Sequence, residues 1–420
     1  MTFHRTLSDH LRDQTGIGYG ALTRVFEPSF TSQVGAWPLL ALLPLRAPPH
    51  PDLWVTSLLR RDLAFAGKIA VLSHGDSPQQ TYEDVRERLR ASGHPMPWKL
   101  LAGAGGELRE GRLVLRGMLL RADRPGAEEQ LSVEGPVEQL AALTVQFVER
   151  FAEALRLTPS DRARTLWNHG RPVSWQSLLD CARAGAEEDL GWVEAAVREG
   201  RIHPDAVVVA EGGDDQEDLA RRLLVLALEK DPSHPEIGFR HFCNIWKGQG
   251  RDSAGARILL QGLRDAPGTG KSQMCLAHLF PHLPSNVAHI LAHAEAGYRL
   301  LPGNNFAISN FMGYLECLAP KDPRRANLIQ EMLDADSHDP RVLKQAMDFY
   351  IQTGKPRTAL DLALHFKKLV SDPADPRTLY CFRQNPVTAA ALDSGEFKPL
   401  EDALRCVGIC ERAVREAERH

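Results

Sequence analysis

The segment from Ala266 to Ser272 has the composition of a phosphate-binding loop. It reads Ala-Pro-Gly-Thr-Gly-Lys-Ser. Such a loop uses backbone N–H groups of glycines to surround phosphate, a lysine to contact the β- and γ-phosphates, and a hydroxyl to hold Mg²⁺. The residues that would bind a nucleotide are Gly268, Gly270, Lys271 and Ser272. Asp265, however, replaces the first glycine of the motif, and its carboxylate would repel phosphate. The sequence favours a glycine-rich turn between helices, with nucleotide binding as an alternative.

Residue types that bind zinc gather just downstream. The cluster consists of Cys275, His278, His282, His289 and His293. His289 and His293 are four residues apart on one helix face and could share a metal ion. No Glu follows His289 as in an HExxH protease motif, and Pro281 interrupts the other histidine pair. Histidines in helical repeats more often serve packing, so we expect no metal site and no cofactor.

Other patterns that could support chemistry have simpler interpretations. The glycine strings at 16–18 and 103–106 lack the following helix and acidic residue of a dinucleotide site, so both are predicted to be turns. Cys406 and Cys410 are interpreted as small buried hydrophobic residues. No G-x-S-x-G nucleophile motif is present. We therefore predict that the protein is not an enzyme.

The composition is that of an ordinary folded protein. The chain has 420 residues, 43% of them hydrophobic and 25% charged, which corresponds to two or three domains. Its net charge of −4 argues against broad binding to nucleic acid. No apolar run reaches the roughly 18 residues of a membrane span, and the first residues lack the apolar region of a signal peptide. The seven scattered cysteines indicate a reducing compartment, so we expect a cytoplasmic protein.

From Trp37 the pattern is that of an α/β domain. Leu39–Leu43 is a continuous apolar run ended by Pro44, which is typical of a strand buried on both faces. A helix over Leu53–Phe65, a strand over Lys68–Ser73 and a helix over Tyr82–Ala91 follow. This alternation predicts that the two strands pair in parallel.

A β-rich stretch comes next. The predicted strands are Trp98–Leu101, Glu107–Arg109, Arg112–Ala122 and Gln130–Val133. The second and third straddle Gly111 as in a hairpin. The apolar side changes phase after Leu115, to Met118 and Leu120, which predicts a β-bulge at Gly117. An amphipathic helix is expected over Val137–Leu155.

Residues 37–157 resemble the N-terminal domain of the TolB translocation protein. They also resemble the related domain that precedes tetratricopeptide repeats in many bacterial adenylate cyclases and transcription regulators. The features that match are the strand ending in Leu43-Pro44, the helical run Leu58–Leu63, the arginine-flanked strand around Gly117, and the long helix after Gly135. The resemblance implies an α/β sandwich without catalytic activity. Residues 1–36 are expected to form a leader or strap, and residues 158–213 a helical connector or a degenerate repeat.

The strongest repeated signal begins at Asp214. Ala220, Leu224, Ala227 and Pro232 follow the small–large–small–proline order of the second helix of a tetratricopeptide repeat. Small residues let helices approach closely, and proline ends the helix. Further prolines at 267, 302, 340 and 373 or 376 give intervals of 35, 35, 38 and 33 or 36 residues, close to the roughly 34 of this family. The fold class predicted is an α/β domain followed by an all-α, tetratricopeptide-like solenoid over residues 214–420.

Each proline interval also contains two helical patterns. The predicted pairs are Phe239–Lys247 with Gly255–Leu263, Met274–Phe280 with Val287–Leu301, Phe306–Leu318 with Arg324–Asp334, and Val342–Ile351 with Thr358–Leu369. A final helix over Leu400–Arg419 is expected to cap the stack. A generic helical bundle is the alternative.

These features favour a scaffold that binds a protein or peptide on the concave face of its repeats, as a monomer or an oligomer. The first helix of each pair lines that face in such repeats. The residues expected to contact the partner are Arg240, Asn244, Lys247, Asn310, Tyr314, Lys344, Gln345 and Asp348. Two alternatives stay open: a regulatory module of a bacterial signalling or transcription system, and a nucleotide-binding protein that uses the segment 266–272.

Overall fold

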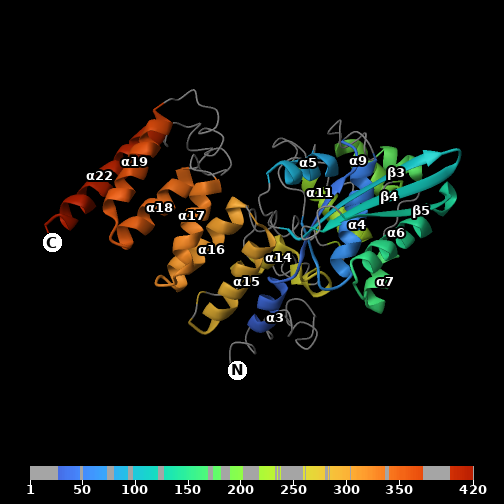
Figure 1. The fold of residues 1–420 in the computed structure, drawn as a ribbon, viewed down its shortest axis with the longest axis horizontal. Helices are drawn as coiled ribbons and strands as arrows, with labels where there is room; N and C mark the ends of the chain where they lie inside the picture. Colours follow the sequence, from blue (N-terminus) through green and yellow to red (C-terminus); the bar gives the residue numbers. More distant parts are fainter. Residues whose placement is uncertain are drawn as a thin grey trace. The chain divides into compact units, whose positions relative to one another are not determined.

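The computed structural model describes residues 27–47, 51–72, 80–92, 98–121, 127–168, 174–180, 190–201, 217–231, 234, 237, 259–260, 262–279, 282, 284–302, 304–335, 340–371 and 398–419. The chain divides into two compact units, Met1–Pro302 and Gly303–His420. Figure 1 shows a mixed sheet with helices in the first unit and helices in the second. The predicted order of an α/β part followed by a helical part is confirmed.

The sheet of the first unit has five strands in the order β2-β1-β3-β4-β5. β1 (Leu39–Pro44) pairs in parallel with β2 (Ala70–Leu72), as predicted, and with β3 (Leu100–Arg109) on its other side. β4 (Arg112–Arg121) and β5 (Glu128–Pro136) continue the sheet in antiparallel fashion. The chain therefore passes from β1 to β2 on one side of β1, and β3 pairs with the opposite side of β1.

Apolar cores cover both faces of the sheet. One contains α4 (Asp52–Phe65) and α6 (Leu140–Ala154), and it receives Leu40 and Leu42 of β1. The other contains residues of α3 (Pro28–Val34) and α5 (Tyr82–Ser92), and it receives Leu39, Ala41 and Leu43. This double cover explains why β1 reads as an unbroken apolar run.

The predicted bulge at Gly117 is wrong. The register of β4 runs without interruption, and Gly117 pairs with Ala104 on one side and Leu131 on the other. The apolar side does not change phase. The second core begins to cover the other face at Met118, while a Cβ on Gly117 would lie 2.5 Å from the ring of Phe151. The missing side chain makes room for that ring.

The turn predicted at residues 103–106 is also wrong. These residues lie inside β3, which joins the two strands expected before and after them. A Cβ on Gly103 would lie 2.7 Å from Tyr82, and a Cβ on Gly105 would lie 2.6 Å from the carboxylate of Asp52. The glycines therefore allow other groups to approach the strand, and glycine in a strand often marks such an approach.

Helices beyond residue 157 also share the core of the sheet, three of them among the labelled elements of the described residues. They are α7 (Asp161–Trp167), capped by the hydroxyl of Ser160, α9 (Leu190–Arg198) and α11 (Glu217–Lys230). Arg61 of α4 donates to Asp231 Oδ2 and to Asp62 Oδ1, each at 2.6 Å, and to the Leu166 carbonyl. The three charged side chains are at most 1% exposed. The break between the two compact units lies at 302/303.

Further along, the first unit contains α14 (Gly270–Leu279), the 3₁₀ turn η3 (Pro284–Asn286) and α15 (Val287–Leu300). α14 packs on α15, and α15 packs on α3. These two helices match the expected pair in this interval. The expected helix Phe239–Lys247 lies outside the described residues.

The second unit has five helices among its described residues. They are α16 (Asn305–Leu318), α17 (Arg324–Ala335), α18 (Pro340–Gln352), α19 (Pro356–Val370) and α22 (Pro399–Ala417). Each contacts the next one named here, and α22 also contacts α18 (Figure 1). Gly354, at φ +74°, forms the turn between α18 and α19. The last two predicted helix pairs are thus present. None of the helices in the described part of the chain has the length and apolar character needed to cross a membrane.

Candidate functional site

The segment 266–272 forms the interhelical turn that the sequence favours. Residues 262–265 are helical, Pro267 and Gly268 turn, and α14 begins at Gly270. A Cβ on Gly268 would lie 2.8 Å from the carbonyl oxygen of Ile69, and a Cβ on Gly270 would lie 2.7 Å from the side chain of Leu301. Both glycines therefore pack against protein. Nucleotide binding stays a prediction that this packing does not favour.

The neighbouring charges also serve the fold. Arg162 donates two hydrogen bonds of 2.6 Å to Asp265, and Arg264 donates two of 3.1 Å. Burial raises the pKa of Asp265, but the hydrogen bonds from Arg162 and then Arg264 outweigh it, so the pKa is lowered. Ser272, which would hold Mg²⁺ in the nucleotide-binding alternative, is 3% exposed.

The histidine cluster is centred on one buried ring. His293 is 0% exposed, and its Nδ1 lies 2.7 Å from Gln273 Oε1, which ties α15 to α14. Burial, with a smaller contribution from His289, lowers the pKa of His293 to about 3. Within the described residues, no group of three or more His, Cys, Asp or Glu side chains is arranged to hold a metal ion.

The residues expected to contact a partner fall into two sets. Arg240, Asn244 and Lys247 lie outside the described residues. The others lie on the first helices of two pairs: Asn310 and Tyr314 on α16, and Lys344, Gln345 and Asp348 on α18.

These side chains differ in how far they are open to solvent. Tyr314 is only 6% exposed, Asn310 and Gln345 are half-buried, and Asp348 is accessible. Partial burial of its carboxyl, and then the nearby Glu316, raise the pKa of Asp348. Tyr314 is therefore mainly a packing residue, which helical spacing alone did not reveal.

The first helices α16 and α18 are directly linked. Gln352 of α18 donates through Nε2 to Glu316 Oε1 of α16 at 3.2 Å, and its Oε1 accepts from Arg325 Nη2 at 2.9 Å. Two turns earlier in α18, Lys344 pairs with Asp402 of α22. Side-chain contacts thus connect α18 to both α16 and α22, and the α16 and α18 faces joined in this way are called the α16–α18 layer below.

A second candidate lies in the first unit, where sequence reasoning predicted no site. A pocket of about 1190 Å³ opens where β1 and β3 end. The residues that line it are Arg46, Ala47, Pro51, Gly106, Glu107, Leu108, Val137, Glu138, Ser174, Trp175, Gln176 and Leu179. The connections of β1 and β3 diverge here, since β1 leads through α4 to β2 while β3 pairs on the opposite side. In open α/β sheets, this switch point is where ligands bind.

Asp52 holds Arg46 beside the pocket. The carboxylate of Asp52 is 0% exposed; it accepts the backbone N–H of Gly106 at 2.9 Å and two hydrogen bonds from Arg46, at 2.9 and 3.1 Å. Arg46 Nη2 also donates to the Gly106 carbonyl at 2.9 Å. Among the described residues, Nη1 of Arg46 donates no hydrogen bond, and the side chain is 45% exposed.

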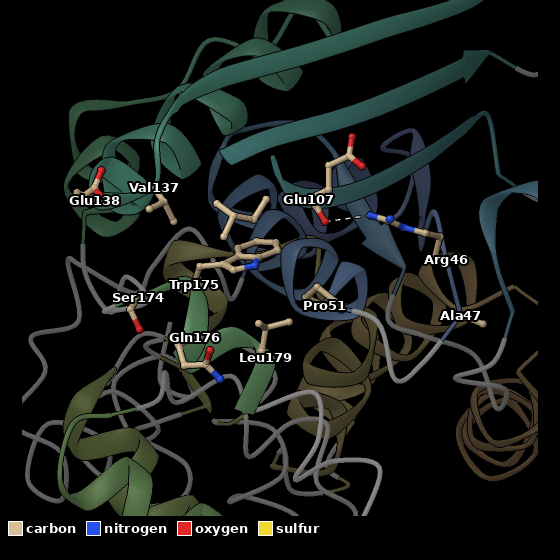
Figure 2. A pocket seen from close by; sticks show the side chains of 12 residues that line it. Arg46, Ala47, Pro51, Glu107, Val137, Glu138, Ser174, Trp175, Gln176 and Leu179 are labelled. Atoms are coloured by element: carbon tan, nitrogen blue, oxygen red, sulfur yellow. Dashed lines mark hydrogen bonds between the residues drawn. The ribbon is translucent and has the colours of Figure 1, made fainter. Parts of the chain in front are cut away.

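Apolar side chains form the wall opposite Arg46. Figure 2 shows the indole of Trp175 at the centre of the pocket, near Leu179, with Arg46 and Glu138 at opposite ends. Trp175 belongs to a helical turn at 175–180, which the hydroxyl of Ser174 caps by accepting the N–H of Ser177. A Cβ on Gly106 would lie 3.0 Å from the indole, so the glycine lets Trp175 pack against β3.

One signal in the sequence could have led to this site. The parallel pairing was predicted, and residues just beyond a parallel strand gather at one sheet edge, so this reasoning, taken one step further, would have pointed to Arg46. Comparisons with protein families, with curated proteins and with solved structures gave no match to this chain.

Proposed function

We propose that this protein is a non-enzymatic cytoplasmic scaffold that holds a protein or peptide partner on the layer of α16 and α18. The observation that carries this proposal is the direct link between the two helices through Glu316, Gln352 and Arg325. In a tetratricopeptide-like solenoid, the first helices of successive pairs lie side by side and form the concave binding face. Helices of unrelated pairs in a generic bundle need not be neighbours in this way.

The chemistry of the layer suits recognition of a polar or charged segment. Its polar residues are the half-buried Asn310 and Gln345 and the exposed Asp348, which offers a carboxylate. The resemblance of residues 37–157 to a noncatalytic domain supports a role without chemistry.

Affinity capture from the source cell tests the proposal when it includes a face variant. The wild-type chain is compared with Asn310→Arg/Asp348→Arg. The control is Asn327→Arg/Asp361→Arg, which makes the same replacements at exposed positions of α17 and α19, the second helices. We expect at least one protein that wild type and control retain and that the face variant loses. If the face variant retains everything that the wild type captures, the assignment of this layer is wrong.

A further inference from the structure

The first unit contains a second candidate site, the pocket at the carboxyl ends of β1 and β3. We propose that it binds a small organic anion, a carboxylate carried on a flat apolar body. All the lining residues belong to the first unit, so this proposal does not rest on partner binding by α16 and α18.

Arg46 supplies the anion-binding group. The hydrogen bonds to Asp52 and Gly106 fix its guanidinium, so little side-chain freedom is lost when a ligand binds. Two N–H bonds of Nη1 remain to donate to a carboxylate, and charge-assisted hydrogen bonds of this kind are about twice as strong as neutral ones.

The charges around Arg46 favour an anion. Glu107 stands next to it, but its carboxylate pairs with Arg109 at 2.6 Å and with Arg116 at 2.9 Å. Figure 2 shows this carboxylate pointing away from Trp175. One net positive charge therefore remains at this end of the pocket. It is the sum over three guanidinium groups and two carboxylates, those of Arg46, Arg109, Arg116, Asp52 and Glu107.

A smaller cavity of about 240 Å³ adjoins the same group. It shares Arg46, Gly106 and Glu107 with the pocket and is also lined by Arg116. Arg46 thus lines both cavities, and Arg116 adds a second guanidinium to the smaller one.

The apolar wall defines the rest of the ligand. Trp175 is 7% exposed and presents an indole to the pocket, while Leu108 is 46% exposed. An exposed leucine next to a tryptophan in a concave site is an unsatisfied apolar surface, which an aromatic ring would cover. The volume exceeds the 300–1,000 Å³ typical of small-molecule pockets, so a ring system fits without rearrangement.

Isothermal titration of the full-length chain with three matched probes tests this. 1-Naphthoate carries the proposed carboxylate, 1-naphthalenemethanol is its neutral counterpart, and 1-naphthylmethylammonium is the cation. We expect saturable binding of one naphthoate per chain, with the alcohol and the ammonium each at least about tenfold weaker.

Two variants locate the binding. Arg46→Lys keeps the positive charge but removes the planar guanidinium with its several N–H donors. Leu108→Asp places a carboxylate on the apolar wall of the pocket. Each should weaken naphthoate binding about tenfold. The matched controls are Arg112→Lys, an ion-paired arginine elsewhere in the sheet, and Leu364→Asp, an exposed leucine of the second unit, and both should leave binding unchanged.

Three results would overturn the proposal. They are the absence of saturable naphthoate binding up to about 1 mM, equal affinity for all three probes, and full affinity in both pocket variants. Leu108→Asp changes an exposed side chain, so the test holds even if Arg46→Lys disturbs the fold. Loss of partner capture would not affect any of these results.

Discussion

Replacing His293 with glutamine should remove part of the pH dependence of unfolding in the first unit. In the folded chain, burial and then His289 lower the pKa of His293 to about 3. In the unfolded chain the pKa of histidine is about 6.5. Below this value the unfolded state binds a proton that the folded state does not bind. The stabilisation is therefore complete above pH 6.5 and is lost as the pH falls toward 3.

The size of the effect follows from these two pKa values. Between pH 7.5 and 5.5, the unfolded state gains about 1.4 kcal/mol from protonation of this one side chain, while the folded state gains almost nothing. Glutamine keeps a donor for Gln273 Oε1, which His293 Nδ1 contacts at 2.7 Å, and it does not titrate. The variant should thus lose about 1.4 kcal/mol less than the wild type over this interval.

Urea unfolding followed by tryptophan fluorescence measures the difference. All seven tryptophans lie before residue 247, so the signal reports on the first unit alone. The dependence of the unfolding free energy on urea should be the same in both proteins, since neither the fold nor the exposed surface changes. If the unfolding free energies of wild type and variant changed equally between pH 5.5 and 7.5, the pKa of about 3 for His293 in the folded chain would be refuted.

Three further outcomes follow from the contacts. Arg61→Met should lower the unfolding free energy of the first unit by about 3–5 kcal/mol, because Asp231 loses its buried cation, and a loss below about 1 kcal/mol in urea unfolding would contradict this. Gly117→Ala should cost about 1–3 kcal/mol by overpacking against Phe151, and Phe151→Leu in the same chain should recover part of it, whereas additive losses would argue against the contact. Burial, and then two neighbouring charges, raise the pKa of the Cys410 thiol to about 11, so a thiol reagent at pH 8 should label it far more slowly than in urea, and equal rates would refute its burial.

Much of the fold could be predicted where side chains carry the pattern. The continuous apolar run Leu39–Leu43 predicted a strand buried on both faces. The spacing of apolar residues predicted the helix pairs of the second unit. The β3 strand could not be predicted over residues 103–106, because glycine has no side chain and so contributes nothing to an alternating pattern. The reason for those glycines lies in Asp52, Trp175 and Tyr82, which are distant in the chain.

The same dependence on side-chain patterns explains why one candidate site could be predicted from the sequence and the other could not. The residues of the α16–α18 layer could be proposed from helix phase, because both the helices and their order were readable. The pocket joins Arg46 to Trp175 across some 130 residues, and no motif marks either one. What connects them is β3: Gly106 donates its N–H to Asp52, accepts from Arg46 at its carbonyl, and leaves space for the indole. A single glycine, read from sequence as part of a turn, thus joins the charged end of the pocket to its apolar wall. A Cβ at this position would lie 3.0 Å from both the Leu115 side chain and the Trp175 indole, so these neighbours would have to shift by a few tenths of an ångström.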